Sequence, residues 1–135
     1  MAITVEMDDV RAIKTLIGAH FDALRWSPGT AADWATFAAD FLADASLFPA
    51  ARPVRRQTLD AFITRMNGVA KGALRSFEEK TLGMQVLVFG NVGVVLAASE
   101  MLENGAEVNR DVSISCSKTR ANGASLRTHG TRLLN

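Results

Sequence analysis

The chain has few side chains suited to catalysis, and one histidine stands out among them. His20 is one of two histidines, and its spacing from Ile13, Ile17 and Leu24 is helical. Residues at this spacing share one helix face, so we expect His20 to point inward with them. An inward histidine can exchange protons near neutral pH. The alternatives are a histidine at the core edge that bonds a backbone carbonyl, or one that faces water.

Glu100 is the second candidate, because it belongs to an alternating apolar stretch. It has the same parity as Val94, Leu96 and Ala98 in a predicted strand. If that face is inward, the carboxylate lies among apolar neighbours, an environment typical of functional acids. The alternative is a glutamate at a strand end in water. Whether Glu100 belongs to a site therefore depends on which face of the strand is buried.

Aromatic and basic side chains supply two further candidates. Trp34, Phe37 and Phe41 follow one face of a predicted helix and could line a cavity for an apolar ligand. Plain core packing is the alternative for such a stripe. Three arginines between residues 52 and 56 could bind an anion, or they could lie in a solvated loop.

Composition excludes several classes of protein. The 135 residues fit one domain, and 48% apolar with 21% charged residues is typical of a globular protein. A single cysteine, Cys116, permits no internal disulfide and no cysteine-rich metal site, which favours a reducing cytoplasm. We predict no metal and no cofactor. No apolar run approaches the ~20 residues of a membrane span, and no signal peptide is evident, so we expect no membrane partner.

Charge is distributed unevenly along the chain. Residues 1–111 contain 11 basic and 14 acidic residues, a net charge of −3, whereas residues 112–135 contain four basic residues and no acid. A basic tail can bind nucleic acid. Four dispersed charges without an aromatic residue do not favour that function, and we predict no nucleic-acid partner.

Periodicity predicts helices followed by strands. Helical spacing indicates helices over about residues 7–26, from the N-cap Thr30, and from the N-cap Thr58 to about residue 71. From Leu74 the period becomes two, with turns at residues 90–91, 104–105 and 122–123. Residues 1–135 therefore form a single α+β domain, in which three N-terminal helices pack on a curved antiparallel sheet.

The first half of the chain also resembles a known family. The stretch AHFDALRWSPGTAADWATFAADFLADASLFP, with the Asp44-Ala45 pair and Pro49, is similar to the first two helices and following loop of nuclear transport factor 2-like (SnoaL-like) proteins. The resemblance covers about residues 7–112. It implies a cystatin-like cone whose sheet and helices enclose a mostly apolar pocket. Some members of this superfamily are enzymes, and others only bind ligands or assemble as dimers or rings.

The family's known reactions fit this sequence poorly. Ketosteroid isomerases use a tyrosine and a carboxylate base, but the chain has no tyrosine. By the resemblance, His20 takes the place of that tyrosine and Phe48 the place of the base. Scytalone dehydratases also use tyrosines, and no spacing here selects the Asp–Arg–Asp trio of limonene epoxide hydrolases.

The resemblance therefore implies a small apolar ligand and an undetermined reaction. The candidate ligand-binding residues are His20, Trp34, Phe37, Phe48 and Glu100. We also expect a homodimer formed through the sheet. The alternative is a non-catalytic association module whose cavity is filled by side chains.

The C-terminal tail, residues 113–135, departs from the family pattern. It reads SISCSKTRANGASLRTHGTRLLN, which is basic and has no aromatic residue, whereas the family's last strand contains a tryptophan-and-arginine phrase. Synonymous codons permit a frame two bases later, from about Ile114, that encodes Trp-Arg-Val-Ala-Ser-His-Ala-Trp-Asp. We therefore hypothesise a frameshift near residues 112–115. The alternative is a genuine but divergent tail.

Overall fold

The computed structural model describes residues 2–39, 41–49, 52–118 and 127–131. The elements follow the order α1 (Ala2–Ala23), β1 (Arg25–Trp26), α2 (Trp34–Ala39), β2 (Ser46–Leu47), β3 (Gln57–Thr58), α3 (Leu59–Lys71), β4 (Phe77–Phe89), β5 (Val92–Glu103), β6 (Glu107–Lys118) and β7 (Arg127–Thr131). Helices precede the long strands, so the predicted α+β class is confirmed.

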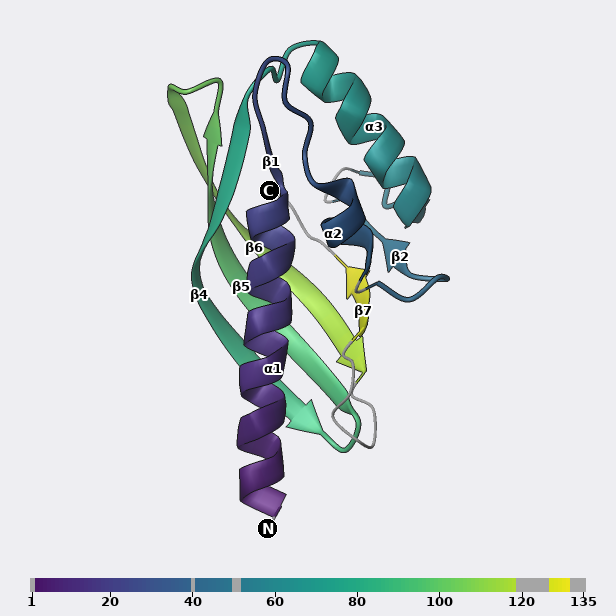
Figure 1. The fold of residues 1–135 in the computed structure, drawn as a ribbon. Helices are drawn as coiled ribbons and strands as arrows, with labels where there is room; N and C mark the ends of the chain where they lie inside the picture. The colour runs from purple at the N-terminus through teal and green to yellow at the C-terminus, as the bar shows by residue number, and fades with distance from the viewer. Residues whose placement is uncertain (1, 40, 50–51, 119–126, 132–135) are drawn as a thin grey trace.

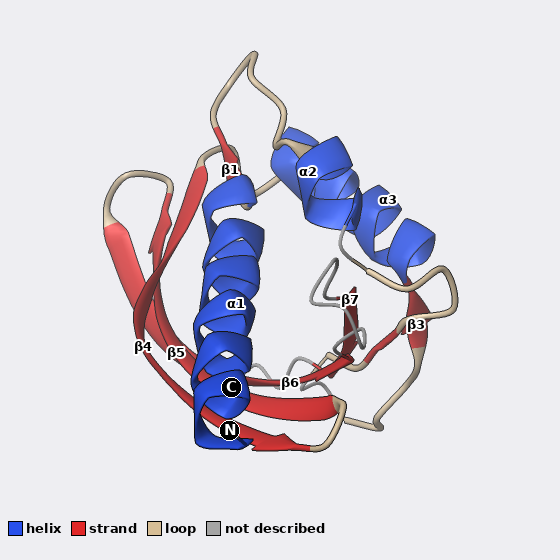
Figure 2. Cartoon of the chain, turned by 60° about the horizontal axis from the view of Figure 1, so that its bottom comes forward, coloured by secondary structure: helices blue, strands red, loops and turns tan. Residues whose placement is uncertain are grey.

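The sheet is a curved antiparallel meander. Its five strands have the order β1–β4–β5–β6–β7, and β2 and β3 form a separate two-stranded sheet. Figure 1 shows α1 running along one face of the sheet, with α2 and α3 beside its upper half. In the turned view of Figure 2, the sheet wraps round one side of α1 while α2 and α3 lie on the other. The predicted packing of three helices on a curved sheet is confirmed.

Two hairpin turns lie where the sequence predicts them. Gly90 has φ 59°, in the loop that joins the paired residues Phe89 and Val92. Asn104 (φ 51°) and Gly105 (φ 73°) join β5 to β6. Glycine adopts positive φ without a Cβ clash, and asparagine tolerates it better than most residues. The turn predicted at residues 122–123 lies outside the described residues.

The first helix ends earlier than its apolar spacing predicts. It ends at Ala23, and Arg25 and Trp26 pair instead with Glu78 and Phe77 at the edge of the sheet. The Trp26 ring stacks on Phe77 with centroids 4.7 Å apart, and its Nε1 donates a hydrogen bond to the backbone oxygen of Leu74. These contacts exist only in the folded chain, so periodicity could not reveal them.

The second helix begins at Trp34 and not at Thr30. Thr30 instead forms an isolated bridge with Ser27. The helix begins after Asp33, whose carboxylate accepts hydrogen bonds from Thr36 Oγ1 (2.6 Å) and Thr36 N (3.1 Å). The hydroxyl bond, then the backbone bond, holds the pKa of Asp33 below its ordinary value.

The third helix agrees with its predicted limits. Thr58 is the N-cap, and its hydroxyl accepts a hydrogen bond from Ala61 N at 3.1 Å. The helix ends at Lys71, directly before Gly72. Its apolar face packs into the core through Leu59, Phe62, Ile63 and Met66.

A β-bulge in β4 changes which residues face the helices. The register of β4 against β5 shifts between Thr81 and Gly83. Before the bulge Phe77 and Glu79 are buried, and after it the inward residues have even numbers: Met84, Val86 and Val88 pack against the core of α1 and β5. The extra residue thus inverts the alternation along one strand.

The tail supplies the last strand of the sheet. β7 pairs with the end of β6, with Cys116 opposite His129. This pairing involves the backbone and does not depend on particular side chains. The frameshift hypothesis therefore stays a prediction.

None of the described helices is both long and apolar enough to cross a membrane.

Candidate functional site

His20 lies in an aromatic cluster between α1 and α2. Its side chain is 6% exposed, so the predicted inward orientation is confirmed. The imidazole stacks on Phe41, with ring centroids 4.6 Å apart and planes 10° apart, and lies 5.7 Å from the Phe37 ring. The sequence thus placed His20 on the correct face of α1.

Trp34 and Phe37 extend the same cluster towards α3. The Trp34 ring meets the rings of Phe37 and Phe62 edge-on, at 5.6 Å and 6.3 Å. Its Nε1 donates a hydrogen bond to Asn67 Oδ1 at 2.8 Å. Phe48 follows β2 and is half-buried, and among the ring contacts between described residues none includes it. Three of the five candidates, His20, Trp34 and Phe37, therefore lie together.

Glu100 faces the opposite side of the sheet. On β5 the buried residues are Val95, Ala97, Ser99 and Met101, so the parity of Glu100 points outward. Its carboxylate lies 3.3 Å from Arg110 Nε and 3.7 Å from Lys80 Nζ, both on neighbouring strands. Glu100 would belong to the interior only if the face that it shares with Val94 and Leu96 were buried. Both of these residues are exposed although they are apolar, so the condition is not met.

Two other carboxylates occupy the inner face, and sequence reasoning missed both. Glu79 on β4 is 1% exposed and Asp111 on β6 is 6% exposed. The strand between them contributes Ser99, whose hydroxyl donates a hydrogen bond to Glu79 Oε1 at 2.9 Å. Asp111 lies directly opposite Ser99 in the ladder, where side chains are close neighbours. Ser113, also buried, is two residues further along β6.

These four residues form a continuous line across three strands, which we call the inner polar track: Glu79, Ser99, Asp111 and Ser113. A carboxylate in such a place can accept hydrogen bonds from a ligand or take up a proton from it. The serines can donate or accept. Since α1 packs against the same face of the sheet, the track lies on the inside of the fold. The only signal in the sequence was Gly83, because an isolated glycine in a strand can indicate a bulge.

In the described part of the chain, no group of three or more histidine, cysteine, aspartate or glutamate side chains is arranged to hold a metal ion. The basic cluster of residues 52–56 is divided: Arg52 and Arg55 line a hollow of about 300 Å³ together with Arg65, while Arg56 Nε donates to Ser46 Oγ.

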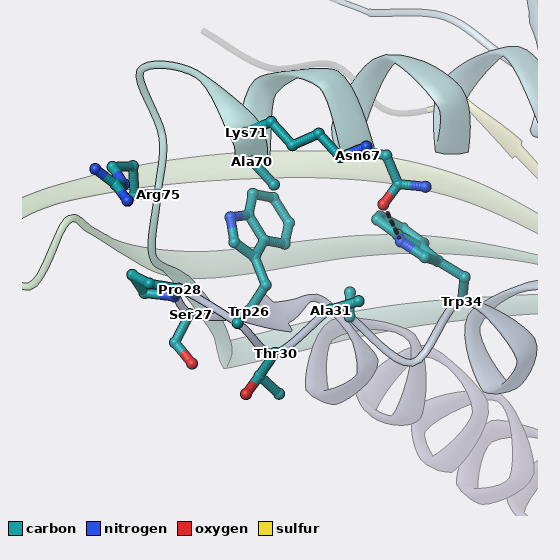
Figure 3. A pocket seen from close by; sticks show the side chains of 12 residues that line it. Trp26, Ser27, Pro28, Thr30, Ala31, Trp34, Asn67, Ala70, Lys71 and Arg75 are labelled. Atoms are coloured by element: carbon teal, nitrogen blue, oxygen red, sulfur yellow. Dashed lines mark hydrogen bonds between the residues drawn. The ribbon is translucent and has the colours of Figure 1, made fainter.

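Trp34 also forms part of a groove outside the aromatic cluster. This groove has a volume of about 410 Å³ and lies between the end of α3 and the loop that precedes α2 (Figure 3). Trp26, Asn67, Lys71 and Arg75 are among its lining residues. Trp34 therefore separates the interior from a surface groove.

Comparison with known proteins identifies the fold. No protein-family model matches the sequence, and no curated protein matches it. Solved structures do. A nuclear transport factor 2-like protein of unknown function from Pseudomonas putida is 12% identical, with a TM-score of 0.68 over 90% of this chain and 81% of that one. This chain has the nuclear transport factor 2-like fold.

Two further structures with this fold cover even more of the chain. The hexachlorocyclohexane dehydrochlorinase LinA-type3 from Novosphingobium barchaimii is 12% identical, with a TM-score of 0.70 over 96% of this chain and 89% of that one. An uncharacterised protein with a cystatin-like fold from Caulobacter vibrioides is 14% identical, with a TM-score of 0.67 over 93% and 89%. The predicted nuclear transport factor 2-like fold is thus confirmed. At such identities only the fold carries over, so function has to be inferred from this chain's own residues.

Proposed function

We propose that the chain binds a small, mostly apolar organic molecule between the helices and the sheet. In this proposal the rings of His20, Phe37 and Phe41 contact the apolar part of the ligand, and the inner polar track contacts its polar part. The observation that carries the proposal is the burial of two carboxylates, Glu79 and Asp111, on the inner face of the sheet.

Burial of these carboxylates is hard to explain by stability alone. An ionised carboxylate loses several kcal/mol of hydration when it leaves water, and hydrogen bonds return only part of this. On the same face of β5, Val95 and Ala97 fill their positions without any such cost. A fold selected only for stability would have apolar residues at positions 79 and 111 as well.

The chemistry that this arrangement permits is proton transfer. A carboxylate that is shielded from water and within reach of a bound molecule can act as a general base. One protein of the same fold is named a dehydrochlorinase, and loss of HCl from a substrate includes removal of a proton. We therefore propose that Asp111 or Glu79 accepts a proton, or a hydrogen bond, from the bound molecule.

Ligand-dependent melting tests the proposal. At a ligand concentration about 100 times Kd, binding stabilises the folded state by about 2.7 kcal/mol, or roughly 5–10 °C in Tm for a domain of this size. We expect a member of a library of small apolar acids, ketones and halides to raise Tm of the wild type. The rise should be much smaller in Glu79→Gln and Asp111→Asn.

The matched control is Glu78→Gln. Glu78 is the neighbour of Glu79 on the other face of β4, in an exposed ion pair with Arg25 at 2.8 Å. Such a pair contributes little, so this variant should respond to the ligand as the wild type does. An equal rise in Tm for all four proteins, or no rise with any compound, would contradict the proposal.

The outer face of the sheet favours a second function, association with another copy of the chain. Large apolar side chains are exposed there, including Leu87 (75%), Phe89 (92%), Leu96 (43%) and Val112 (51%). Contiguous apolar surface of this kind marks interfaces. The row Lys80–Glu100–Arg110 crosses the same face, and a two-fold axis through it would set cations of one copy against the Glu100 of the other.

Light scattering coupled to size-exclusion chromatography tests this second function. The wild type should elute as a dimer and Leu96→Lys as a monomer, because a charge would be buried in the interface. Val54→Lys is the control, since Val54 is 65% exposed and lies in the loop before β3, outside the five-stranded sheet. A monomeric wild type would exclude the interface. A stable dimer that responds to no ligand would favour the association module over the ligand-binding proposal.

A further inference from the structure

A small hollow between α3 and the loop that enters β3 is lined by three arginines. Arg52, Arg55 and Arg65 line it together with Gln57 and two prolines, and its volume of about 300 Å³ is at the lower end of the range for small-molecule sites. β3 leads directly into α3 (Figure 2). The hollow shares no lining residue with the inner polar track or with the aromatic cluster, so it is separate from the interior site proposed above.

Arg65 is turned towards the end of α3 at which β3 enters. Its Cζ atom lies over the Phe62 ring, 5.7 Å from the ring centroid. Phe62 lies one turn closer to the N-terminus of the helix, and helical side chains lean in that direction. Because the Phe62 ring is buried, this contact restricts the guanidinium and holds one charged side of the hollow in place before a ligand arrives.

The segment that enters β3 supplies the other charged side. Arg55 and Gln57 both line the hollow, and side chains two residues apart point to the same side of an extended chain. The residue between them, Arg56, does not line it, and its Nε donates a hydrogen bond to Ser46 Oγ. Arg55 and Arg65 therefore reach one hollow from two separate elements.

The polar side chains that line the hollow present hydrogen-bond donors. A guanidinium donates and does not accept. The Oε1 atom of Gln57 is buried and has no hydrogen-bond partner among the described residues, so the end of the amide that is left to face the hollow is its NH₂ group. None of the described lining residues is acidic, and none of the three arginines forms an ion pair within the described part of the chain.

The charge of this segment is opposite to that of the chain around it. Residues 52–65 contain four arginines and one acidic residue, although residues 1–111 have a net charge of −3. Like charges held close together repel one another, and this repulsion destabilises the compact state. An anion bound in the hollow would remove that repulsion.

We infer that this hollow binds a phosphate group. Guanidinium groups hold phosphate by charge-assisted hydrogen bonds, and the planar fork of arginine matches two phosphate oxygens at once. Arg55 and Arg65 donate to the phosphate from their separate elements, Arg52 adds a third positive charge, and Gln57 donates from its amide. The phosphate is carried by a small molecule or is the free ion, since both present the same oxygens.

Titration of the full chain with inorganic phosphate tests the inference. At constant ionic strength, we expect the backbone ¹⁵N–¹H signals of residues 52–65 to shift to saturation, with a Kd of about 1 mM or tighter. Glycerol 3-phosphate presents the same group on a small molecule. Equal or tighter binding of this ester would identify a phosphate ester as the ligand, whereas saturation by inorganic phosphate alone would identify the free ion.

Single-charge variants separate recognition by the hollow from general electrostatic attraction. Arg55→Gln and Arg65→Gln should each weaken phosphate binding about fivefold to tenfold, the scale of one charge-assisted hydrogen bond. Arg56→Gln is the matched control, because it removes the same charge from a neighbouring residue that bonds Ser46 outside the hollow, and it should change the affinity less than about twofold. Equal weakening by all three variants would overturn the inference, as would signals that do not reach saturation.

Discussion

The close approach of Gly93 to Ile13 yields a sharp prediction about how α1 is seated on the sheet. A Cβ built on Gly93 would lie 2.5 Å from Ile13 Cδ1, closer than real side chains come. Ile13 is 0% exposed and packs in a cluster with Ile17, Phe21, Val95 and Ala97. Alanine at position 93 must therefore displace the Ile13 side chain within a packed core.

We expect Gly93→Ala to destabilise the fold by about 1–3 kcal/mol, the usual cost of one extra methyl group in a full core. For a domain of this size, that corresponds to a fall in Tm of roughly 3–12 °C. Urea unfolding followed by circular dichroism would give the free energy of unfolding. Gly83→Ala is the matched control in a neighbouring strand, because a Cβ there meets nothing within 4 Å.

The partner substitution Ile13→Val makes the test specific. It removes the Cδ1 atom that causes the clash, and alone it should cost about 0.5–1.5 kcal/mol. In the Gly93→Ala background it should cost less than that, or restore stability, with a coupling energy of at least about 0.5 kcal/mol. Strict additivity in this cycle, or a Gly93→Ala variant as stable as the wild type, would refute the assigned contact. Since α1 also carries His20, the same contact determines where the histidine is held.

Three further predictions follow from other parts of the fold. The pKa of Asp33 is lower in the folded chain than its ordinary value of 3.8, so its carboxylate stabilises the fold at pH values above 3.8, and this contribution is lost as pH falls through the lower folded pKa. Asp33→Asn should therefore flatten the pH dependence of Tm below pH 3.8. An unchanged profile would show that the Thr36 bonds do not stabilise α2. Asn104→Gly keeps the positive φ but removes three side-chain hydrogen bonds, to the backbone of Ala73, Arg75 and Ser76. It should therefore lower the free energy of unfolding in urea by about 1–3 kcal/mol, and an unchanged value would show that these bonds do not stabilise the loop after α3. The nucleotide sequence across codons 105 to 135 should contain the overlapping tryptophan-rich phrase if the tail is frameshifted, and its absence would end that hypothesis.

Local signals in the sequence predicted those parts of the fold that depend on local chemistry. Thr58 caps α3, Gly90 and Asn104 form turns, and His20 points inward, as spacing and residue type indicated. These features depend on backbone preference or on one helical face. Each can be recognised within a window of a few residues.

Features that depend on strand pairing were not predictable in the same way. Trp26 pairs with Phe77 as an edge strand of the sheet, and α1 therefore ends before it, at Ala23. Alternation along β5 could not show that Glu100 points outward, because both faces of this strand carry apolar residues. Glu79 was missed because one extra residue in β4 inverts the alternation that identifies buried positions.

The bulge between Thr81 and Gly83 has a consequence for how such a protein can evolve. Phe77 and Glu79 point inward before it, and Met84, Val86 and Val88 point inward after it. Because side chains alternate along a strand, loss of one codon there would leave only one of these two sets facing the helices. The inner polar track at one end of β4 and the seat of α1 at the other can therefore coexist only in a lineage that keeps the insertion.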